Sequence, residues 1–154
     1  MPAIKSDLIH AYLFRIHDGS IEILQFRRTE HPLLGTWQPV MGHLHPGESA
    51  MQAAARETLE ETGLDIRSTH CRAWYALEQI HPFFLPQADA VILSPSFAVE
   101  VTHEFIPRLC PEHDRFRWIP ESSIDDCFMW PGQRLSAREI RSLIVPGVLR
   151  ALDR

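Results

Sequence analysis

The sequence predicts a mixed α+β fold, because strand-like runs and a few helical segments share one chain of 154 residues. Its apolar fraction of 45% and charged fraction of 23% are typical of a globular protein with a hydrophobic core. The chain contains no repeat, low-complexity tract or flexible linker, so we expect one domain over residues 1–154. A chain of this length buries enough surface to fold without a metal or disulfide staple.

Charge and composition disfavour several partners. The net charge of −5 argues against a nucleic-acid polymer as ligand, since that role needs a basic face. The longest apolar stretches are too short to cross a bilayer, and the first residues lack the basic and apolar regions of a secretory signal. Three widely spaced cysteines fit neither a disulfide framework nor a zinc knuckle. We therefore expect a cytoplasmic protein with free thiols and no membrane partner.

The first elements form a predicted β-hairpin. Leu8–Ile16 and Ile21–Phe26 have strand-like composition, and the turn residues His17–Ser20 join them. A loop over Thr29–Thr36 contains a proline and a glycine, and a short extended piece, Trp37–Met41, follows it. The hairpin and this piece together predict neighbouring strands of one sheet.

Glu48–Thr62 carries the strongest helix signal in the chain. It contains neither Gly nor Pro and is rich in Ala, Glu, Met and Leu, while Gly63 is well placed to end it. The spacing predicts a modest buried stripe of four residues at i, i+3, i+4 and i+7: Met51, Ala54, Ala55 and Thr58.

The second half of the chain predicts further strands and short helices. The expected elements are a long strand over Ile66–Ile80, a loop over His81–Gln87, two extended runs over Ala90–Val101 broken by Ser94-Pro95-Ser96, a loop over Thr102–Asp114, a strand over Arg115–Ile119, a small helix over Pro120–Asp126, and a helix from Pro131 to the end with an interruption at Pro146-Gly147.

Three glutamates of the predicted helix share one face. Glu57, Glu60 and Glu61 stand at i, i+3 and i+4, so Glu60 and Glu61 lie about 60° and 40° on either side of Glu57. Between Gly42 and Leu64 there are four acids and a single base, and like charges at this spacing repel. Divalent cations prefer oxygen ligands, so the cluster indicates either a metal site or a solvated acidic face.

The flanking residues favour the metal site. Residues 42–64 resemble the Nudix box, Gly-x5-Glu-x7-Arg-Glu-U-x-Glu-Glu-x-Gly-U, where U is bulky and aliphatic. Eight of its nine specified positions match, and the single departure is Thr58 at the first U. Threonine keeps a β-branched methyl group on the buried side, so we expect the departure to affect packing slightly and chemistry not at all.

The resemblance implies a fold, a cofactor and a set of site residues. The fold is an α/β/α sandwich with a mixed β-sheet and a catalytic loop–helix–loop. The reaction is hydrolysis of a nucleoside diphosphate linked to another moiety, with Mg²⁺ or Mn²⁺ bridging pyrophosphate oxygens. The implied metal ligands are the side chains of Glu57, Glu60 and Glu61 and the carbonyl of Gly42. Arg56 is implied to hold a box carboxylate in place, and Glu48 to be structural.

A further acid is expected outside the box. Glu112-His113-Asp114-Arg115-Phe116-Arg117-Trp118 resembles the Glu-His-x-x-Tyr-x-Trp pattern of Nudix pyrophosphatases that act on deoxynucleoside or dihydroneopterin triphosphates. This resemblance implies that Glu112 is a fourth carboxylate, acting as metal ligand or general base. The alternatives are that Glu112 is an exposed loop acid, or that Glu100 or Glu104 takes the role.

Substrate-binding residues are predicted at two further places. Trp130 and Arg134 resemble residues of the same subgroup and are expected to line a base pocket, with a core Trp and a solvated Arg as the alternative. Arg27 and Arg28 leave the second strand as candidate phosphate clamps or as a solvated strand end. A zinc site at His43-x-His45 is less favoured than two solvent-facing histidines.

These observations predict a pyrophosphohydrolase of a nucleoside or pterin triphosphate that releases a monophosphate and pyrophosphate. The first alternative is a Nudix hydrolase of ADP-ribose, a nucleotide sugar or a dinucleoside polyphosphate. Gln79 and His81 stand where the ADP-ribose and dinucleoside polyphosphate subgroups tend to carry Pro and Tyr, which counts against those two. The second alternative, a non-catalytic nucleotide sensor, is disfavoured because every box glutamate is kept. Family members often form homodimers, although no residue here marks an interface.

Overall fold

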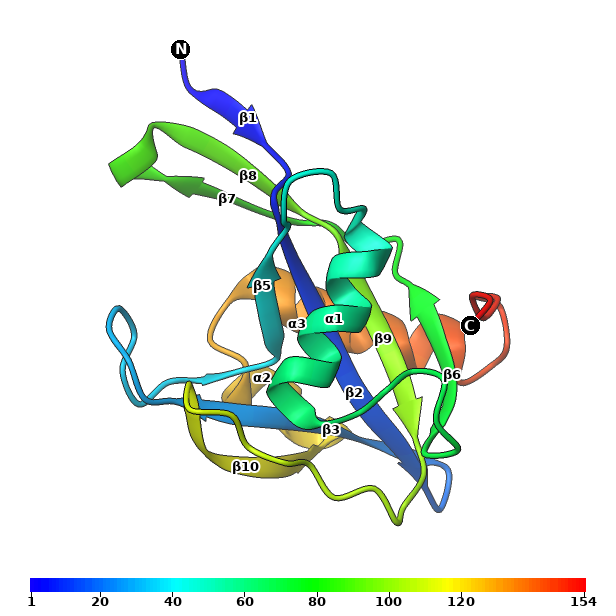
Figure 1. The fold of residues 1–154 in the computed structure, drawn as a ribbon. Coiled ribbons are helices and arrows are strands. Elements are labelled where there is room, and N and C mark those ends of the chain that lie inside the picture. Colours follow the sequence, from blue (N-terminus) through cyan, green and yellow to red (C-terminus); the bar gives the residue numbers. More distant parts are fainter.

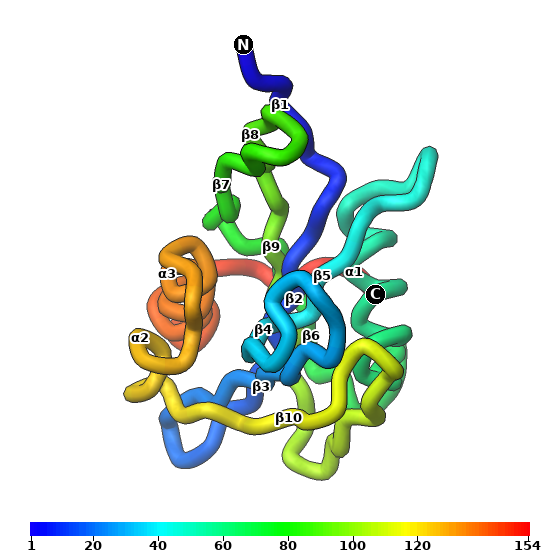
Figure 2. The backbone as a smooth tube through the Cα atoms, turned by 90° about the vertical axis from the view of Figure 1, so that its left-hand side faces the viewer, coloured from blue at the N-terminus to red at the C-terminus, as the bar shows by residue number.

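The computed structural model describes all residues 1–154 and confirms the mixed α+β fold. A seven-stranded mixed sheet lies between helix α1 on one face and helix α3 on the other (Figures 1 and 2). Its strands follow the order β10–β3–β2–β9–β6, with β4 paired to β3 and β5 paired to β2. The strand bounds are β2 Leu8–His17, β3 Ser20–Arg28, β4 Trp37–Gln38, β5 Val40–His43, β6 Cys71–Ala76, β9 Ser96–Val101 and β10 His113–Pro120.

Strand β2 divides the core into two halves. It pairs antiparallel with β3 and β5 and parallel with β9, so it is buried along most of its length. Because side chains alternate along a strand, Ile9 and Leu13 pack into a core shared with α1. Tyr12 and Phe14 pack into a second core shared with α3.

Helix α1 (Ala50–Thr62) carries the acidic face predicted for it, but its buried face differs from the prediction. Ser49 is the N-cap residue of a capping box with Gln52, and Gly63 ends the helix in the left-handed conformation at φ 78°. The buried residues are Ala53, Ala54, Thr58, Glu61 and Thr62. Met51, which we expected in the stripe, is 42% exposed, and Ala55 is only half-buried. The small side chains Ala53 and Ala54 lie against the sheet instead.

A second, three-stranded sheet projects from the main body (Figure 1). It consists of β1 (Ala3–Lys5), β8 (Ala90–Ser94) and β7 (His81–Leu85), and a 3-10 turn, η1 (Pro86–Ala88), joins β7 to β8. The prediction of a loop over His81–Gln87 was wrong for most of its length. Strand β7 lies at the edge of its sheet, so its outer side has no neighbouring strand to receive backbone hydrogen bonds. Pro82, which has no backbone N–H to donate, is tolerated there for that reason.

The predictions for two other segments were too long. Of Ile66–Ile80 only β6 is a strand, and turns precede it. After η2 (Glu121–Ser123) and α2 (Ile124–Cys127), helix α3 (Pro131–Glu139) continues as the π-helical turn η3 (Ile140–Ile144) and does not reach the end of the chain.

The last residues cross to β6 instead of continuing the helix. Gly147 has a φ of 77°, which turns the chain out of the helical direction. The Leu152 amide then donates to the Trp74 carbonyl (2.8 Å), and the Trp74 indole donates to the Asp153 carbonyl (3.0 Å). No helix in the structure combines the length and apolar character that a membrane span needs.

Candidate active site

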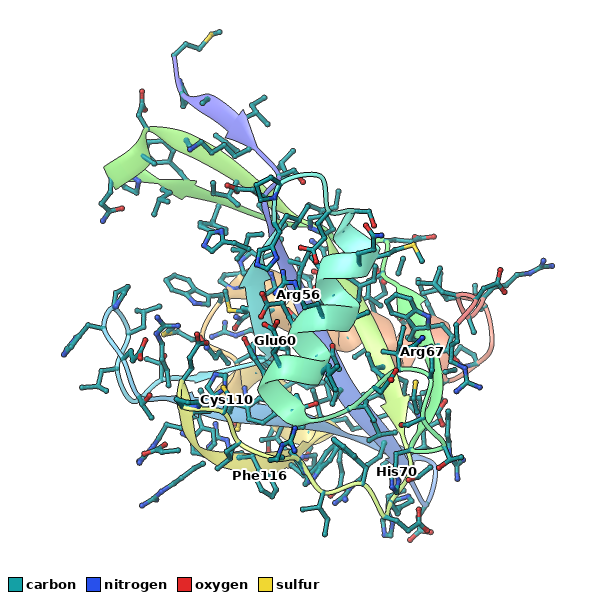
Figure 3. The ribbon with its side chains drawn as sticks, viewed as in Figure 1. Arg56, Glu60, Arg67, His70, Cys110 and Phe116 are labelled. Atoms are coloured by element: carbon teal, nitrogen blue, oxygen red, sulfur yellow. The ribbon has the colours of Figure 1, made fainter.

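Five carboxylates from three parts of the chain face one cavity of about 400 Å³, and four of them are residues that the sequence singles out. Glu57, Glu60 and Glu61 come from α1, and Glu112 comes from the segment just before β10. The other lining residues are Glu30, Cys110 and Pro111. Figure 3 shows Arg56 and Glu60 on α1, with Cys110 on the chain segment that leads to β10. The three box glutamates therefore share one cavity, as their spacing predicts.

A second cavity of about 450 Å³ adjoins the first. Its lining residues are Leu8, Arg28, Met41, Gly42, His43, His45, Glu57 and Glu112. Glu57 and Glu112 line both cavities, so they stand at the boundary between them. The first cavity is lined mainly by carboxylates, whereas the second is also lined by the guanidinium of Arg28 and the imidazoles of His43 and His45. This arrangement suits a ligand that carries negative charge and is partly neutralised by cations.

Gly42 lets strand β5 approach helix α1 closely. A Cβ atom at this position would overlap the side chain of Glu57, including its carboxylate carbon. Gly42 has no positive φ, so the requirement for glycine here is the close approach alone. The local packing therefore places the Gly42 backbone directly beside the Glu57 carboxylate.

Arg56 forms hydrogen bonds to three of the four glutamates of the box. Its guanidinium donates two bonds to Glu48 (2.8 and 2.9 Å), one to Glu57 (2.6 Å) and one to Glu60 (3.2 Å), and also contacts the His43 carbonyl (2.9 Å). The hydrogen bonds from Arg56 lower the pKa of Glu48 to about 2. Arg56 thus fixes the orientation of the loop before α1 and of the first ligand candidate, Glu57.

Glu61 has no such cationic partner. Its side chain is only 5% exposed, and its Oε2 atom has no hydrogen-bond partner. Burial, followed by repulsion from Glu57 and Glu112, raises the pKa of Glu61 to about 9. Burial also raises the pKa of Glu57, although Arg56 opposes that shift. A buried carboxylate oxygen without a donor, among other carboxylates, marks a place that a cation would stabilise.

The donor set fits a hard divalent cation. All the candidate side-chain ligands are carboxylates, which are the ligands that Mg²⁺ and Mn²⁺ prefer. No three acidic, histidine or cysteine side chains are yet arranged closely enough to hold an ion together. One reason is that Glu57 Oε1 is engaged by Arg56. Metal binding would therefore require small side-chain movements around the unpaired Glu61 oxygen.

The structure places Glu112, and neither of the two other acids considered, beside the box. Glu100 lies on β9, where its carboxylate is 4.0 Å from Arg72, and it lines neither cavity. Glu104 is exposed in the loop after β9 and also lines neither cavity. Glu112 lines both cavities. Of the three acids considered, Glu112 alone faces the glutamates of α1, and Glu30 is a second acid outside the box in the same cavity.

The predicted substrate-binding residues separate into two groups. Arg28 lines the second cavity, and its Nε donates to the carbonyls of Glu30 (3.0 Å) and Pro32 (2.8 Å). Arg27 forms an ion pair with Asp114 and lines neither cavity.

The two candidates near α3 also lie outside both cavities. Trp130 is exposed as the N-cap residue of α3, and Arg134 Nε donates to the Phe128 carbonyl (2.7 Å). Neither residue lines either cavity beside the carboxylates.

Three residues at the site were not predicted as functional. Glu30 and Cys110 line the acidic cavity, and no local pattern marks either one. His113 is buried, and its Nδ1 lies 3.5 Å from Cys110 Sγ and 4.0 Å from Glu61 Oε2. The Gln38 amide donates to the other ring nitrogen of His113 (3.2 Å). The only sequence signal for His113 is its place in the Glu-His-x-x-Tyr-x-Trp pattern.

Comparison with known proteins identifies the domain. The family model for the NUDIX domain matches residues 8–139. An octanoyltransferase of Myxococcus xanthus is 40% identical over 55% of the chain, and the asymmetrical bis(5'-nucleosyl)-tetraphosphatase of Sus scrofa is 31% identical over 54%. Phosphatase NudJ of Escherichia coli is 29% identical over 74% of the chain. The matched regions span 23%, 54% and 64% of these relatives, respectively.

Solved structures share the fold at low sequence identity. A NUDIX hydrolase structure from Listeria monocytogenes superimposes with a TM-score of 0.79 at 20% identity, covering 96% of this chain and 100% of the other. The dihydroneopterin triphosphate pyrophosphohydrolase of E. coli gives a TM-score of 0.75 at 18% identity, with coverages of 92% and 99%. At this identity the likeness concerns the fold alone.

Proposed function

This chain belongs to the Nudix family of pyrophosphohydrolases, and on that basis we propose that it is a metal-dependent hydrolase of a nucleoside or pterin triphosphate. The products are a monophosphate and pyrophosphate. The observation that carries the proposal is the acidic cavity, in which Glu57, Glu60, Glu61 and Glu112 converge and one buried Glu61 oxygen has no partner. We assign this activity to a single Nudix domain over residues 1–154, with its box at 42–64.

The proposed cofactor is Mg²⁺ or Mn²⁺. The side chains of Glu57, Glu60 and Glu61 and the carbonyl of Gly42 would hold it, and Glu112 would act as a further ligand or as the general base. When bound, such an ion neutralises the developing charge on the pyrophosphate oxygens and favours attack by water. Two of these ligands are also constrained by the protein itself, because Arg56 orients Glu57 and Gly42 brings β5 against the same side chain.

The residues of the chain have distinct proposed roles in hydrolysis. Glu112 is positioned to accept a proton from the attacking water as a new P–O bond forms and the phosphoanhydride bond breaks, with the electron pair leaving on pyrophosphate. Arg28, which lines the adjoining cavity, is proposed to bind a phosphate oxygen. Arg27 on β3, and Trp130 and Arg134 at the start of α3, remain proposed substrate contacts, although none of the three lines either cavity.

The triphosphate is favoured by the residues around Glu112. The run from Glu112 to Trp118 resembles the pattern of pyrophosphatases that act on triphosphates. A second candidate substrate is a dinucleoside polyphosphate, because the Sus scrofa tetraphosphatase is 31% identical over about half of the chain. ADP-ribose and nucleotide sugars share the pyrophosphate that the box would bind. We further propose a cytoplasmic enzyme whose ligands are small phosphates, not nucleic-acid polymers or membranes, with a homodimer as one possible assembly.

A substrate panel with product analysis tests the proposal. The panel contains the deoxynucleoside triphosphates, dihydroneopterin triphosphate, ADP-ribose, a nucleotide sugar and a dinucleoside polyphosphate, each with Mg²⁺, Mn²⁺ or excess EDTA. We expect pyrophosphate release from a triphosphate that stops in EDTA and in the Glu57→Gln variant. Cleavage of a linked diphosphate alone would contradict the triphosphate assignment and keep the family. Nucleotide binding without any hydrolysis would favour the sensor alternative.

A further inference from the structure

The acidic cavity beside α1 contains one thiol among its carboxylates. Cys110 is a free, half-buried cysteine, and it lines the cavity together with Glu61 and Glu112. The proposed Mg²⁺ or Mn²⁺ chemistry uses oxygen ligands and gives this sulfur no role. A thiol is a ligand for a different class of cation, and the residues around Cys110 offer that cation further ligands.

A tight turn holds Cys110 against His113. The His113 amide donates to the Cys110 carbonyl (3.1 Å), which closes a four-residue turn, and Pro111 occupies the second position, where proline is favoured. Both middle residues of the turn are fixed from outside, because the Thr29 hydroxyl donates to the Pro111 carbonyl and the Thr29 amide to the Glu112 carbonyl (both 2.9 Å). The turn thus brings Cys110 Sγ to 3.5 Å from His113 Nδ1.

Glu61 adds an oxygen donor from a different element, helix α1. Its Oε2 atom is 4.0 Å from His113 Nδ1, and its side chain is only 5% exposed. The same oxygen has no hydrogen-bond partner in the protein. An unpaired buried carboxylate oxygen is costly, so its place next to an imidazole and a thiol indicates a ligand that joins the three groups. Sulfur and nitrogen donors from the turn therefore meet an oxygen donor from the helix.

The distances between these atoms are close to those around a tetrahedral zinc ion. Zinc–sulfur bonds of about 2.3 Å and zinc–nitrogen bonds of about 2.1 Å place the two ligand atoms about 3.6 Å apart, and Cys110 Sγ and His113 Nδ1 are 3.5 Å apart. The corresponding nitrogen–oxygen distance is about 3.4 Å, whereas Nδ1 and Glu61 Oε2 are 4.0 Å apart. The three side chains therefore do not enclose an ion as they lie, and a shift of the Glu61 carboxylate by about half an ångström would complete the set.

Gln38 can hold His113 in the form that binds a cation. The Gln38 side-chain nitrogen lies 3.2 Å from His113 Nε2, and both residues are buried. As the amide lies, its N–H donates to Nε2 and leaves the ring proton on Nδ1. A half-turn of the same amide presents its oxygen to an Nε2–H group, so that Nδ1 becomes free to bind a metal ion. The partner that a histidine ligand needs on its other nitrogen is therefore already in contact.

We propose that Cys110, His113 and Glu61 bind a thiophilic divalent cation of the Zn²⁺ and Cd²⁺ class, with water or a neighbouring carboxylate as the fourth ligand. Cys110 binds as the thiolate, and its proton passes to solvent. Because Glu61 is also a proposed ligand of Mg²⁺, the two cations compete for it, and bound Zn²⁺ inhibits hydrolysis. The binding is independent of the proposed function, whereas the inhibition rests on it.

Cadmium titration of cysteine variants tests the thiolate ligand. Metal-free protein is titrated with Cd²⁺ in a reductant that contains no thiol, and thiolate-to-cadmium absorption in the near ultraviolet reports sulfur coordination. We expect one cadmium ion per chain with this absorption in the wild type. In Cys110→Ser the absorption should disappear, and cadmium should bind at least about tenfold more weakly because its sulfur ligand is gone.

Cys127→Ser is the matched control. Cys127 is also free and half-buried, but it lines neither cavity. We expect its cadmium absorption and affinity to equal those of the wild type, and buried Cys71 is present in all three proteins. No absorption in the wild type, or absorption that persists in Cys110→Ser, would overturn the proposal.

X-ray absorption of the zinc-loaded wild type tests His113 without substitution of a buried residue. We expect one sulfur at about 2.3 Å and one imidazole nitrogen at about 2.0–2.1 Å from the zinc. Calorimetry of Glu61→Gln tests the oxygen ligand, and zinc should bind at least about tenfold more weakly to this variant. A shell of oxygen alone, sulfur without imidazole, or unchanged affinity in Glu61→Gln would contradict the three-residue site.

Inhibition measurements separate this inference from the proposed activity. Hydrolysis with Mg²⁺ is measured against added Zn²⁺, and each variant is compared with its own rate in Mg²⁺ alone. We expect the inhibiting zinc concentration to rise at least about tenfold in Cys110→Ser and to keep its wild-type value in Cys127→Ser. Cadmium binding through Cys110 without any hydrolysis would support the site and contradict the proposed function. Hydrolysis without cadmium–thiolate absorption would overturn the site and keep the function.

Discussion

Among single residues, Arg56 and Glu61 give the main support for the proposed cation. Arg56 bonds to three carboxylates and compensates much of the charge that the box concentrates on one helix face. Glu61 lies beyond its reach, buried and with one oxygen unpaired. Burial and repulsion from Glu57 and Glu112 raise the pKa of Glu61, so without a cation this carboxyl keeps a proton that a bound cation would displace. Arg56 orients the carboxylates by hydrogen bonds, whereas the unpaired oxygen of buried Glu61 is a position that a bound cation would stabilise.

Substitution of Glu112 tests the carboxylate outside the box. We expect Glu112→Gln to lower kcat by on the order of 10²–10³-fold, because it removes a charged group at the reacting phosphate while keeping the side-chain shape. Glu100→Gln and Glu104→Gln are the matched controls and should stay close to wild type, since neither residue lines the cavities. Steady-state rates measured at saturating Mg²⁺ test which of the three glutamates is needed for turnover. A large loss in either control with none in Glu112→Gln would reassign the role.

Between elements, the critical contact is that of β5 with α1. Capping by Ser49 and Gly63 sets the length of α1, but its distance from the sheet depends on small residues at the contact. Gly42 on β5 and Ala53 and Ala54 on α1 allow the helix to lie close. The close contact brings a backbone carbonyl and a helix carboxylate into one candidate ligand set.

Gly42→Ala should therefore reduce activity strongly in a protein that still folds. The added methyl group overlaps Glu57, so we expect the variant to lose about 1–3 kcal/mol of unfolding free energy and at least about tenfold in kcat. Urea denaturation and steady-state kinetics measure the two effects. In a double-mutant cycle with Glu57→Ala, the stability loss should largely disappear, because the obstructing side chain is gone. Additive losses in that cycle would contradict the contact as the cause.

For the whole molecule, buried ionisable groups give opposing pH dependences. Burial lowers the pKa of His10 to about 3 in the folded protein. As the pH falls below 6.5, His10 is therefore protonated in the unfolded chain before it is protonated in the folded protein. Stability from this residue is complete above pH 6.5 and is lost toward pH 3. The raised pKa of Glu61, about 9, acts in the other sense, with stability lost as the pH rises from 4.5. Only a comparison of variants separates the two effects.

His10→Asn isolates the histidine contribution. The Asn amide can still donate to Ser94, and it does not titrate. His81, stacked on His10, and the neighbouring Tyr12 remain in both proteins. Between pH 6.5 and 4.5 we expect wild-type unfolding free energy to fall faster than that of the variant, by up to about 1.4 kcal/mol per pH unit. Urea denaturation at several pH values measures the difference, and parallel curves would exclude His10 as the cause.

The sequence by itself determined the features that depend on neighbours along the chain. The hairpin of β2 and β3, helix α1 and the shared face of Glu57, Glu60 and Glu61 follow from periodicities of two and 3.6 residues and from the local end signals. The Nudix box lies wholly within such a local unit. For that reason the sequence alone is sufficient to predict the family and the reaction class.

Only the tertiary structure decided what depends on distant segments. It placed Glu30 and Cys110 at the box, which no local pattern marks, and it brought Glu112, but neither Glu100 nor Glu104, to the same cavity. It made His81–Leu85 an edge strand by pairing it with β8, and it ended the last helix early by bonding residues 152 and 153 to Trp74. It also stacked the His10 ring of β2 on the His81 ring of β7. These outcomes depend on pairing and packing between residues far apart in the chain, and short-range periodicity carries no information about them.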